Sequence, residues 1–159
     1  GFLYVGLMIK KNEPYLIEYN VRMGDPECQV ILPRLKTDFV KILKSSVSHK
    51  LKKIKINWIK KKTMTIVLCS KGYPGLYKKN LQINNIDKVK LNKDNFIYHA
   101  GTKFFKNKII TSGGRVLSMT SIGYSFLKIR KKIILNLKSL GFKDGFYRKD
   151  IGWKVIKKK

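Results

Sequence analysis

The stretch Leu16-Ile-Glu-Tyr-Asn-Val-Arg-Met-Gly-Asp-Pro-Glu-Cys-Gln29 places polar side chains at every second position of a segment that reads as a β-strand. Glu18, Asn20 and Arg22 alternate, and alternate side chains of a strand point to the same face. The Glu18 carboxylate and the Asn20 amide are then about 6–7 Å apart along the strand. Such hard oxygen ligands suit Mg²⁺, which takes one or two protein ligands and fills its remaining positions with water and phosphate oxygens. The spacing predicts a magnesium–phosphate site; the alternative is a half-exposed strand whose polar side chains face water.

The segments around this stretch predict a β-hairpin before it and a helix after it. Phe2–Ile9 and Tyr15–Val21 are strand-like and are joined by a short, turn-rich connection. Gly24 and Pro26 then break the strand, and Pro26 favours an extended backbone at Asp25. Farther on, apolar residues with 3- and 4-residue spacing predict a helix over residues 39–51, with Thr37 or Asp38 as its cap.

Composition restricts the chain to a few classes of protein. Its 159 residues, 43% hydrophobic and 28% charged, suit one ordinary domain, or one domain plus a piece of another. The sequence contains no membrane span and no signal peptide, so we expect a cytoplasmic protein without a membrane partner. Because Gly1 opens directly on an apolar run, we expect upstream sequence to be missing. Cys28 and Cys69 lack metal-ligand spacing and are expected to be free thiols.

The net charge of +27 suggests a nucleic-acid partner, because dense positive charge is typical of phosphate-backbone binding. However, only 5 of the 36 basic residues are arginines, and the lysines run along the whole chain. Ala100 is the only alanine, while Ile, Asn and Lys abound, which is typical of an AT-rich coding sequence. We therefore interpret the charge as coding bias and expect only non-specific binding of nucleic acid.

The second half of the chain predicts a small, mostly antiparallel β region with one long amphipathic helix. Thr63–Ser70 reads as a buried strand, and short strand-like runs with turn signals continue to Thr120. Apolar positions then step from Ile122 to Leu140 by 3 and 4, with Gly141 placed for a C-terminal cap. Residues 144–153 read as a last aromatic, strand-like piece. The fold class predicted for the whole chain is α+β.

With these residues in view, the chain resembles the C-terminal part of the phosphoribosylamine–glycine ligase family, glycinamide ribonucleotide synthetases of the ATP-grasp superfamily. The motifs are weak singly but occur in order along nearly the whole chain. They are Tyr4–Met8, Glu18–Glu27, Gln29–Lys36 with Asp38, Gly72–Gly75, His99–Thr102, Gly113–Leu117 and Phe146–Gly152. The resemblance implies the end of an ATP-grasp domain over residues 1–51, a linker over 52–62 and a small C-terminal domain over 63–156.

The resemblance also implies a reaction. The glycine carboxylate attacks the γ-phosphate of ATP to give glycyl phosphate, and the amine of 5-phosphoribosylamine then displaces phosphate. Glu18 and Asn20 would hold Mg²⁺ or Mn²⁺, and Arg22 would stabilise charge on the transferred phosphoryl group. Because most of the ATP-grasp fold and the N-terminal domain have no counterpart here, we expect the chain to be inert without that missing portion of the enzyme.

Other residues keep two interpretations each. Asp25 and Glu27 would line the substrate site, or would merely shape a turn. Arg115, after a Gly-Gly turn, would meet a substrate phosphate, or would be an ordinary strand arginine. His99 is a catalytic candidate or a satisfied structural histidine. For the whole chain, the alternative to a ligase fragment is a basic nucleic-acid-associated module on a decayed ligase fold.

Overall fold

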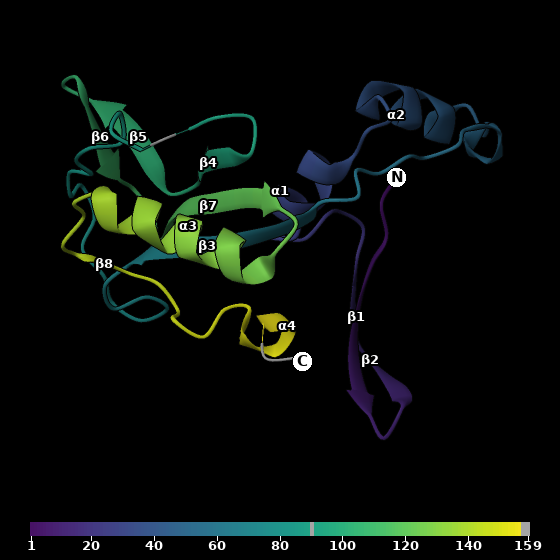
Figure 1. The fold of residues 1–159 in the computed structure, drawn as a ribbon, viewed down its shortest axis with the longest axis horizontal. Coiled ribbons are helices and arrows are strands. Elements are labelled where there is room, and N and C mark those ends of the chain that lie inside the picture. The colour runs from purple at the N-terminus through teal and green to yellow at the C-terminus, as the bar shows by residue number, and fades with distance from the viewer. Residues whose placement is uncertain (90, 157–159) are drawn as a thin grey trace. The chain divides into compact units, whose positions relative to one another are not determined.

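The computed structural model describes residues 1–89 and 91–156, and its element order is traced in Figure 1. The chain divides into two compact units, Gly1–Lys60 and Lys61–Lys159, which we describe separately. All strand ladders within the described residues are antiparallel, and helices accompany them in both units. The fold is therefore α+β and mostly antiparallel, as the sequence predicts. None of the helices in residues 1–89 and 91–156 has the length and apolarity needed to cross a bilayer.

The first unit begins with the predicted hairpin, formed by β1 (Tyr4–Lys10) and β2 (Glu13–Asn20). Its turn residues Lys11 and Asn12 have φ of 50° and 67°, the left-handed pair typical of a tight two-residue hairpin turn. Gly6 pairs with Glu18 but Leu7 pairs with Leu16, so Ile17 is an extra residue and forms a β-bulge. The bulge lies immediately before the polar end of β2.

Helices of the first unit follow the hairpin: α1 (Cys28–Ile31), the 3₁₀ turn Leu32–Arg34 and α2 (Phe39–Val47). Asp38 caps α2, because its Oδ1 accepts the backbone N–H of Lys41 at 2.9 Å. The predicted extension of this helix to Leu51 is wrong. His49 takes a left-handed φ of 57°, which ends the helix, and Leu51 starts a separate 3₁₀ turn, Leu51–Lys53.

Residues 54–60 return along the first unit. Trp58 forms an antiparallel bridge with Leu35, the Lys36 N–H donates to the Asn57 carbonyl at 2.9 Å, and the Ile59 N–H donates to the Arg34 carbonyl at 2.8 Å. This segment therefore pairs briefly with the chain after the 3₁₀ turn instead of forming a regular edge strand.

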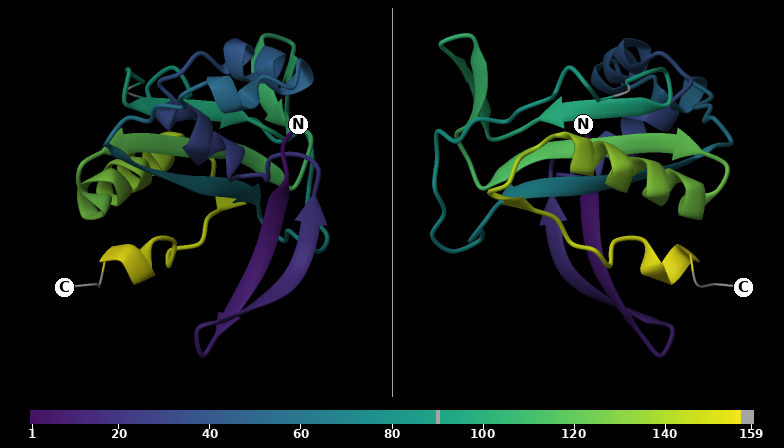
Figure 2. Two further views of the ribbon diagram at one scale, coloured as in Figure 1. Left: turned by 90° about the vertical axis from the view of Figure 1, so that its right-hand side faces the viewer. Right: turned by 60° about the vertical axis from the view of Figure 1, so that its left-hand side comes forward.

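The second unit contains a four-stranded sheet in the order β4-β7-β3-β8. These strands are β3 (Lys62–Ser70), β4 (Asn95–His99), β7 (Arg115–Gly123) and β8 (Gly145–Phe146); a separate hairpin joins β5 (Thr102–Phe105) to β6 (Lys108–Thr111). Met64, Ile66 and Leu68 alternate along β3 and are buried in the core. Helix α3 (Phe126–Ser139) runs along one face of this sheet (Figure 2).

The apolar stripe of α3 supplies the other half of that core. Ile133 and Leu140 have no exposed surface, and Ile129 and Leu137 are also buried. Full burial of such a side chain contributes about 1.5–3 kcal/mol. The stripe is core, as predicted, although its first member, Ile122, lies in β7 and the helix starts after the Ser125 cap. Gly141 has a φ of 60°, as a C-terminal cap requires.

The predicted strand over residues 144–153 is largely wrong. Only Gly145–Phe146 pairs with β3, and the last described residues form the short helix α4 (Trp153–Ile156). Between them, Arg130 of α3 reaches the chain: its Nε donates to the Ile151 carbonyl at 3.0 Å and an Nη donates to the Lys149 carbonyl. The Arg130 guanidinium thus donates the hydrogen bonds that these two carbonyls would accept from a neighbouring strand in a sheet.

Candidate functional site

Glu18 and Asn20 share one face at the end of β2. In the ladder with β1, Glu18 pairs with Gly6 and Asn20 pairs with Tyr4. Because directly paired residues and alternate residues point the same way, these four positions form one face of the hairpin. Glu18 is exposed and Asn20 is half-buried, so both oxygens remain reachable from solvent.

The absence of a side chain at Gly6 leaves room for the arm of Glu18. A Cβ at position 6 would lie 3.1 Å from Cγ of Glu18 and 3.6 Å from its carbonyl oxygen. Together with the bulge at Ile17, this cradle directs the Glu18 side chain across the strand pair.

Arg22 lies beyond the strand. Strand β2 ends at Asn20, and Arg22 sits in a bend where its Nη1 donates to the Met23 carbonyl at 3.1 Å. The expectation that Arg22 follows on the same strand face is therefore wrong, because the alternation stops two residues earlier. Its catalytic role remains a prediction.

Asp25 and Glu27 lie in the turn that leads into α1. The Cys28 N–H donates to the Gly24 carbonyl at 2.9 Å, and Gln29 Nε2 donates to Asp25 Oδ1 at 2.8 Å. The Glu27 carboxylate folds over Gly24, in the space that a Cβ would need. These contacts account for a turn-shaping role, and substrate binding by either carboxylate remains a prediction.

In the second unit, three sequence motifs meet at one end of the sheet. The backbones at Gly101 and Gly113 touch, since a Cβ on Gly101 would lie 2.6 Å from Cα of Gly113, and the Tyr73 ring occupies the space beside Gly114. The Gly101 N–H donates to the Arg115 carbonyl at 2.8 Å, and Ser70 Oγ donates to the Gly113 carbonyl at 3.1 Å. We call this set of loops, residues 70–75, 99–102 and 112–115, the glycine junction.

Three titratable side chains lie in or next to the glycine junction: Cys69, His99 and Arg115. Arg115 starts β7, is exposed and lies opposite Cys69 in the ladder. Burial raises the pKa of the Cys69 thiol, and the positive charge of Arg115 partly opposes that rise. His99 Nδ1 lies 2.9 Å from Thr102 Oγ1, within hydrogen-bond distance, which favours the structural interpretation of this histidine.

Two features of these regions do not follow from the local sequence pattern. The two-residue turn alone would pair Gly6 with Ile17, and only the bulge at Ile17 brings Gly6 opposite Glu18. A pocket beside the glycine junction, whose lining includes Lys71, Lys78 and Asp144, is also not marked in the sequence, because lysines occur throughout the chain.

Comparison with known proteins identifies the family. The family model described as "Phosphoribosylglycinamide synthetase, C domain" matches residues 63–154, which is more than half of the chain. The chain belongs to the phosphoribosylglycinamide synthetase family. The model for the ATP-grasp (A) domain of phosphoribosylglycinamide synthetase matches residues 1–28, where Glu18 and Asn20 lie.

Relatives of this synthetase family carry ligase names. A phosphoribosylamine–glycine ligase from Caldanaerobacter subterraneus is 45% identical over 95% of this chain and 36% of its own length. A trifunctional purine biosynthetic protein adenosine-3 from Gallus gallus is 40% identical over 98% of the chain and 16% of its own length. The solved phosphoribosylamine–glycine ligase of Thermotoga maritima superposes with a TM-score of 0.72 at 31% identity, covering 94% of this chain and 36% of that protein. This synthetase-family chain thus spans about a third of the length of the single-activity ligases.

Proposed function

We propose that this chain supplies the metal-holding end of the ATP-grasp domain and the C domain of an ATP-dependent ligase that joins glycine to 5-phosphoribosylamine in purine biosynthesis. The observation that carries the proposal is that Glu18 and Asn20 lie on the same face of β2, within the residues that match the ATP-grasp family model. The ligase would act in the cytoplasm on ATP, glycine and 5-phosphoribosylamine.

Glu18 and Asn20 fit a Mg²⁺ or Mn²⁺ ion. They offer a carboxylate and an amide oxygen side by side, and the Gly6 cradle orients the carboxylate arm. The described residues contain no cluster of three or more His, Cys, Asp or Glu side chains that could hold a metal. Two protein oxygens suit an ion that completes its shell with water and phosphate oxygens. Such an ion neutralises charge on the nucleotide phosphates.

The remaining candidates would act on the reacting groups. Arg22 carries a fixed positive charge two residues beyond Asn20 and would stabilise the phosphoryl group as it passes to the glycine carboxylate. Asp25 and Glu27 would orient the amine of the second substrate, and Arg115 would meet its phosphate.

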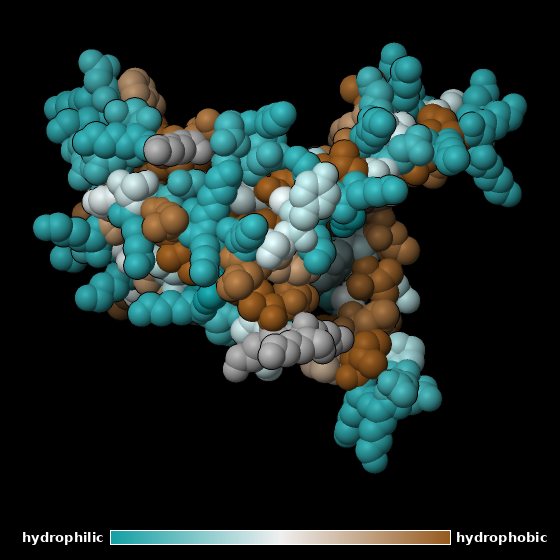
Figure 3. Space-filling model, in the orientation of Figure 1, coloured by the Kyte–Doolittle hydropathy of each residue, from teal (hydrophilic) through white to brown (hydrophobic). Residues whose placement is uncertain are grey.

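The β1–β2 hairpin exposes an apolar surface of the kind that another part of a protein usually covers. Its apolar side chains are exposed on both strands, including Leu7 at 50%, Met8 at 58%, Ile17 at 62% and Tyr19 at 61%. Figure 3 shows brown, hydrophobic residues along the hairpin above a hydrophilic tip. An isolated two-stranded hairpin is marginally stable in water. We propose that the remainder of the ATP-grasp domain covers this surface, and that the chain is inactive without it.

The test restores that remainder by joining the upstream part of the Caldanaerobacter ligase to this chain. We expect ATP turnover that requires both glycine and 5-phosphoribosylamine, and no turnover by the 159-residue chain alone. Loss of an electrostatic catalytic group typically lowers kcat by about 10²–10³-fold, so Glu18→Gln should do so. Glu13→Gln removes the same charge from the other end of β2 and should leave activity unchanged. Equal activity of the two variants, or turnover by the chain alone, contradicts the proposal.

A further inference from the structure

Residues 80–83 extend the β5–β6 hairpin of the second unit into a three-stranded ribbon. Strand β6 pairs with β5 on one side, and on its other side Ile110 forms an antiparallel bridge with Gln82. The Ile83 N–H also donates to the Ile109 carbonyl at 2.9 Å, which continues this pairing. We call residues 80–83 together with β5 and β6 the lysine ribbon. Figure 2 shows its β5–β6 hairpin projecting from the rest of the second unit.

The two faces of the lysine ribbon differ. Ile83 and Ile109 lie on one face, where Ile83 is part of the hydrophobic core and Ile109 packs against it. On the other face, Phe105 lies opposite Lys108, and Lys103 is the alternate residue of β5. Directly paired and alternate residues of a ladder point the same way, so these three side chains share that face. All three are exposed, and this face is therefore open to a partner.

Phe105 presents an aromatic ring flanked by lysines. It is 53% exposed, and Lys106 Nζ lies 5.5 Å from the centre of its ring. Lys106 and Asn107 form the two-residue turn of the hairpin, with φ of 46° and 59°, which fixes the backbone of this lysine beside the ring. The face thus offers an apolar stacking surface and positive charge at the same place.

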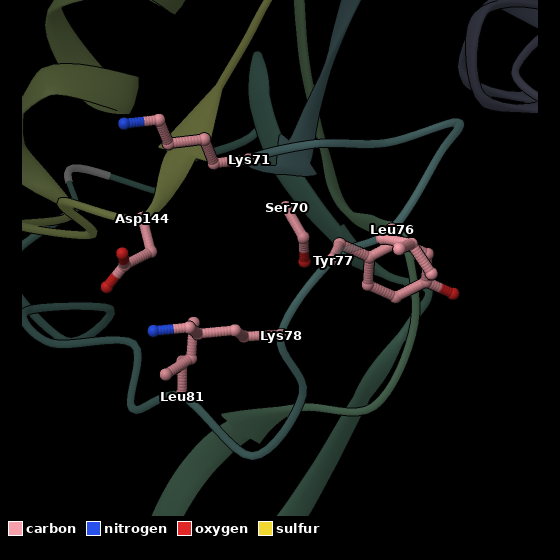
Figure 4. Close-up of a pocket in the computed structure, with 7 residues that line it drawn as sticks. All are labelled: Ser70, Lys71, Leu76, Tyr77, Lys78, Leu81 and Asp144. Atoms are coloured by element: carbon pink, nitrogen blue, oxygen red, sulfur yellow. The ribbon is translucent and has the colours of Figure 1, made fainter.

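The sequence of the lysine ribbon contains no carboxylate that would oppose this charge. Residues 71–83 and 95–143 contain no Asp or Glu. Figure 4 shows the carboxylate of Asp144 in the neighbouring pocket, on the side to which the ammonium groups of Lys71 and Lys78 extend. We therefore leave these two lysines out of the site.

We propose that the open face of the lysine ribbon binds single-stranded nucleic acid without regard to its base sequence. A base stacks on the ring of Phe105, because every base has a π-face, and the lysines of the hairpin contact the neighbouring phosphates. The exposed ring favours a single strand over a duplex, whose bases are already stacked on one another, and over an acidic protein, which carries no bases. Charge spread over the whole chain attracts any polyanion, whereas the lysine ribbon adds stacking at one place.

This inference goes beyond the proposed ligase function, and its test requires neither ATP nor the upstream part of the ligase. The 159-residue chain is titrated into labelled oligothymidylate, and fluorescence anisotropy is measured. The strand is about 12 nucleotides long, within the usual size of single-stranded sites. An abasic strand of equal length keeps the phosphates without the bases, and polyglutamate offers carboxylates. We expect oligothymidylate to bind about tenfold more tightly than either, which is within the effect of stacking one base. Equal binding of the three probes overturns the proposal.

Two neighbouring phenylalanines provide a matched pair of variants. Phe105→Leu removes the ring from the open face and should weaken the binding of oligothymidylate about tenfold, while the binding of the abasic strand stays unchanged. Phe104 is 72% exposed but lies on the opposite face, so Phe104→Leu should change neither. If both phenylalanines are only products of coding bias, both variants will bind as the parent does, and the proposal is overturned.

The salt dependence of binding reports how many phosphates the lysine ribbon contacts. The three lysines of the hairpin should give a slope of about −2 when the logarithm of the binding constant is plotted against that of the salt concentration. Lys103→Gln with Lys108→Gln should bring this slope closer to zero by about 1. Lys131→Gln with Lys138→Gln removes the same charge from exposed positions of α3 and should leave the slope unchanged. Equal effects of the two pairs overturn the proposal. Loss of binding once the upstream part of the ligase is joined to the chain also overturns it, because the ribbon would then be an internal surface.

Discussion

Gly6 lies directly across the β1–β2 ladder from Glu18, and a Cβ at position 6 would approach Cγ of Glu18 to 3.1 Å. This is tighter than ordinary van der Waals contact, so a side chain at position 6 would shift the Glu18 arm by a few tenths of an ångström. The orientation of the proposed metal ligand therefore depends on a residue that has no side chain of its own.

Replacing Gly6 should weaken metal binding without removing a metal ligand. We expect Gly6→Ala, in the enzyme completed with its upstream part, to raise the Mg²⁺ concentration for half-maximal activity about tenfold, the lower end of effects seen when residues that orient ligands are changed. Activity as a function of Mg²⁺ concentration measures this. Val5→Thr alters the neighbouring residue, whose side chain lies on the opposite face, and should leave the metal dependence unchanged. An unchanged Mg²⁺ dependence in Gly6→Ala would show that the cradle does not orient Glu18.

The parts of the fold that the sequence predicts well are those that periodicity determines. The β1–β2 hairpin, the core stripe of α3 and the Gly141 cap follow from alternation, helical spacing and backbone freedom. The errors lie where one side chain or one dihedral angle decides the outcome. His49 ends α2 by its left-handed backbone, and the Arg130 side chain binds the Ile151 carbonyl in the segment predicted to be a strand.

The candidate site divides in the same way. Alternation correctly predicts that Glu18 and Asn20 share a face, because both lie within one strand. It fails for Arg22, because nothing in the local pattern marks the end of β2 at Asn20. The glycine junction does not follow from local patterns, since it joins Ser70 to Gly113, 43 residues away in the sequence, only after the sheet has formed.

The contact between Gly101 and Gly113 should make the glycine junction sensitive to a single methyl group. A Cβ on Gly101 meets backbone atoms at 2.6 and 2.7 Å, whereas one on Gly113 meets its nearest atom at 3.1 Å. Overpacking costs about 1–3 kcal/mol, so Gly101→Ala should reduce the free energy of unfolding by that amount and Gly113→Ala by less. Urea unfolding followed by Trp153 fluorescence, with Trp58 changed to Phe, measures it. Gly1→Ala, where a Cβ meets nothing within 4 Å, is the control, and an equal midpoint for Gly101→Ala and Gly1→Ala would refute the contact.

The cap of α2 should contribute measurably to the first unit. Asp38→Ala removes the acceptor of the Lys41 N–H and should destabilise that unit by about 1 kcal/mol, whereas Asp38→Asn keeps an oxygen acceptor and should cost less. Trp58, bridged to Leu35 in the same unit, reports its unfolding in urea when Trp153 is changed to Phe. If Asp38→Ala and Asp38→Asn unfold at the same midpoint as the parent, the cap does not stabilise the helix.

The raised pKa of Cys69 should make its thiol slow to react, and the positive charge of Arg115 should influence the rate of that reaction. Burial favours the neutral thiol, and Arg115 opposes this, so Arg115→Gln should raise the pKa further. The pH at which Cys69 reaches half its maximal alkylation rate by iodoacetamide should then move upward, with Cys28→Ser isolating the signal. Because the folded thiol keeps a proton that the unfolded chain releases, Cys69 contributes stability at pH values below its unfolded pKa, and this contribution is lost as pH rises through its folded pKa.

The control for the alkylation experiment is Arg148→Gln, which removes a guanidinium that pairs with Asp150 and should leave the alkylation profile unchanged. A shift as large as that in Arg115→Gln would mean that overall charge, and not the position of Arg115 opposite Cys69, sets the reactivity.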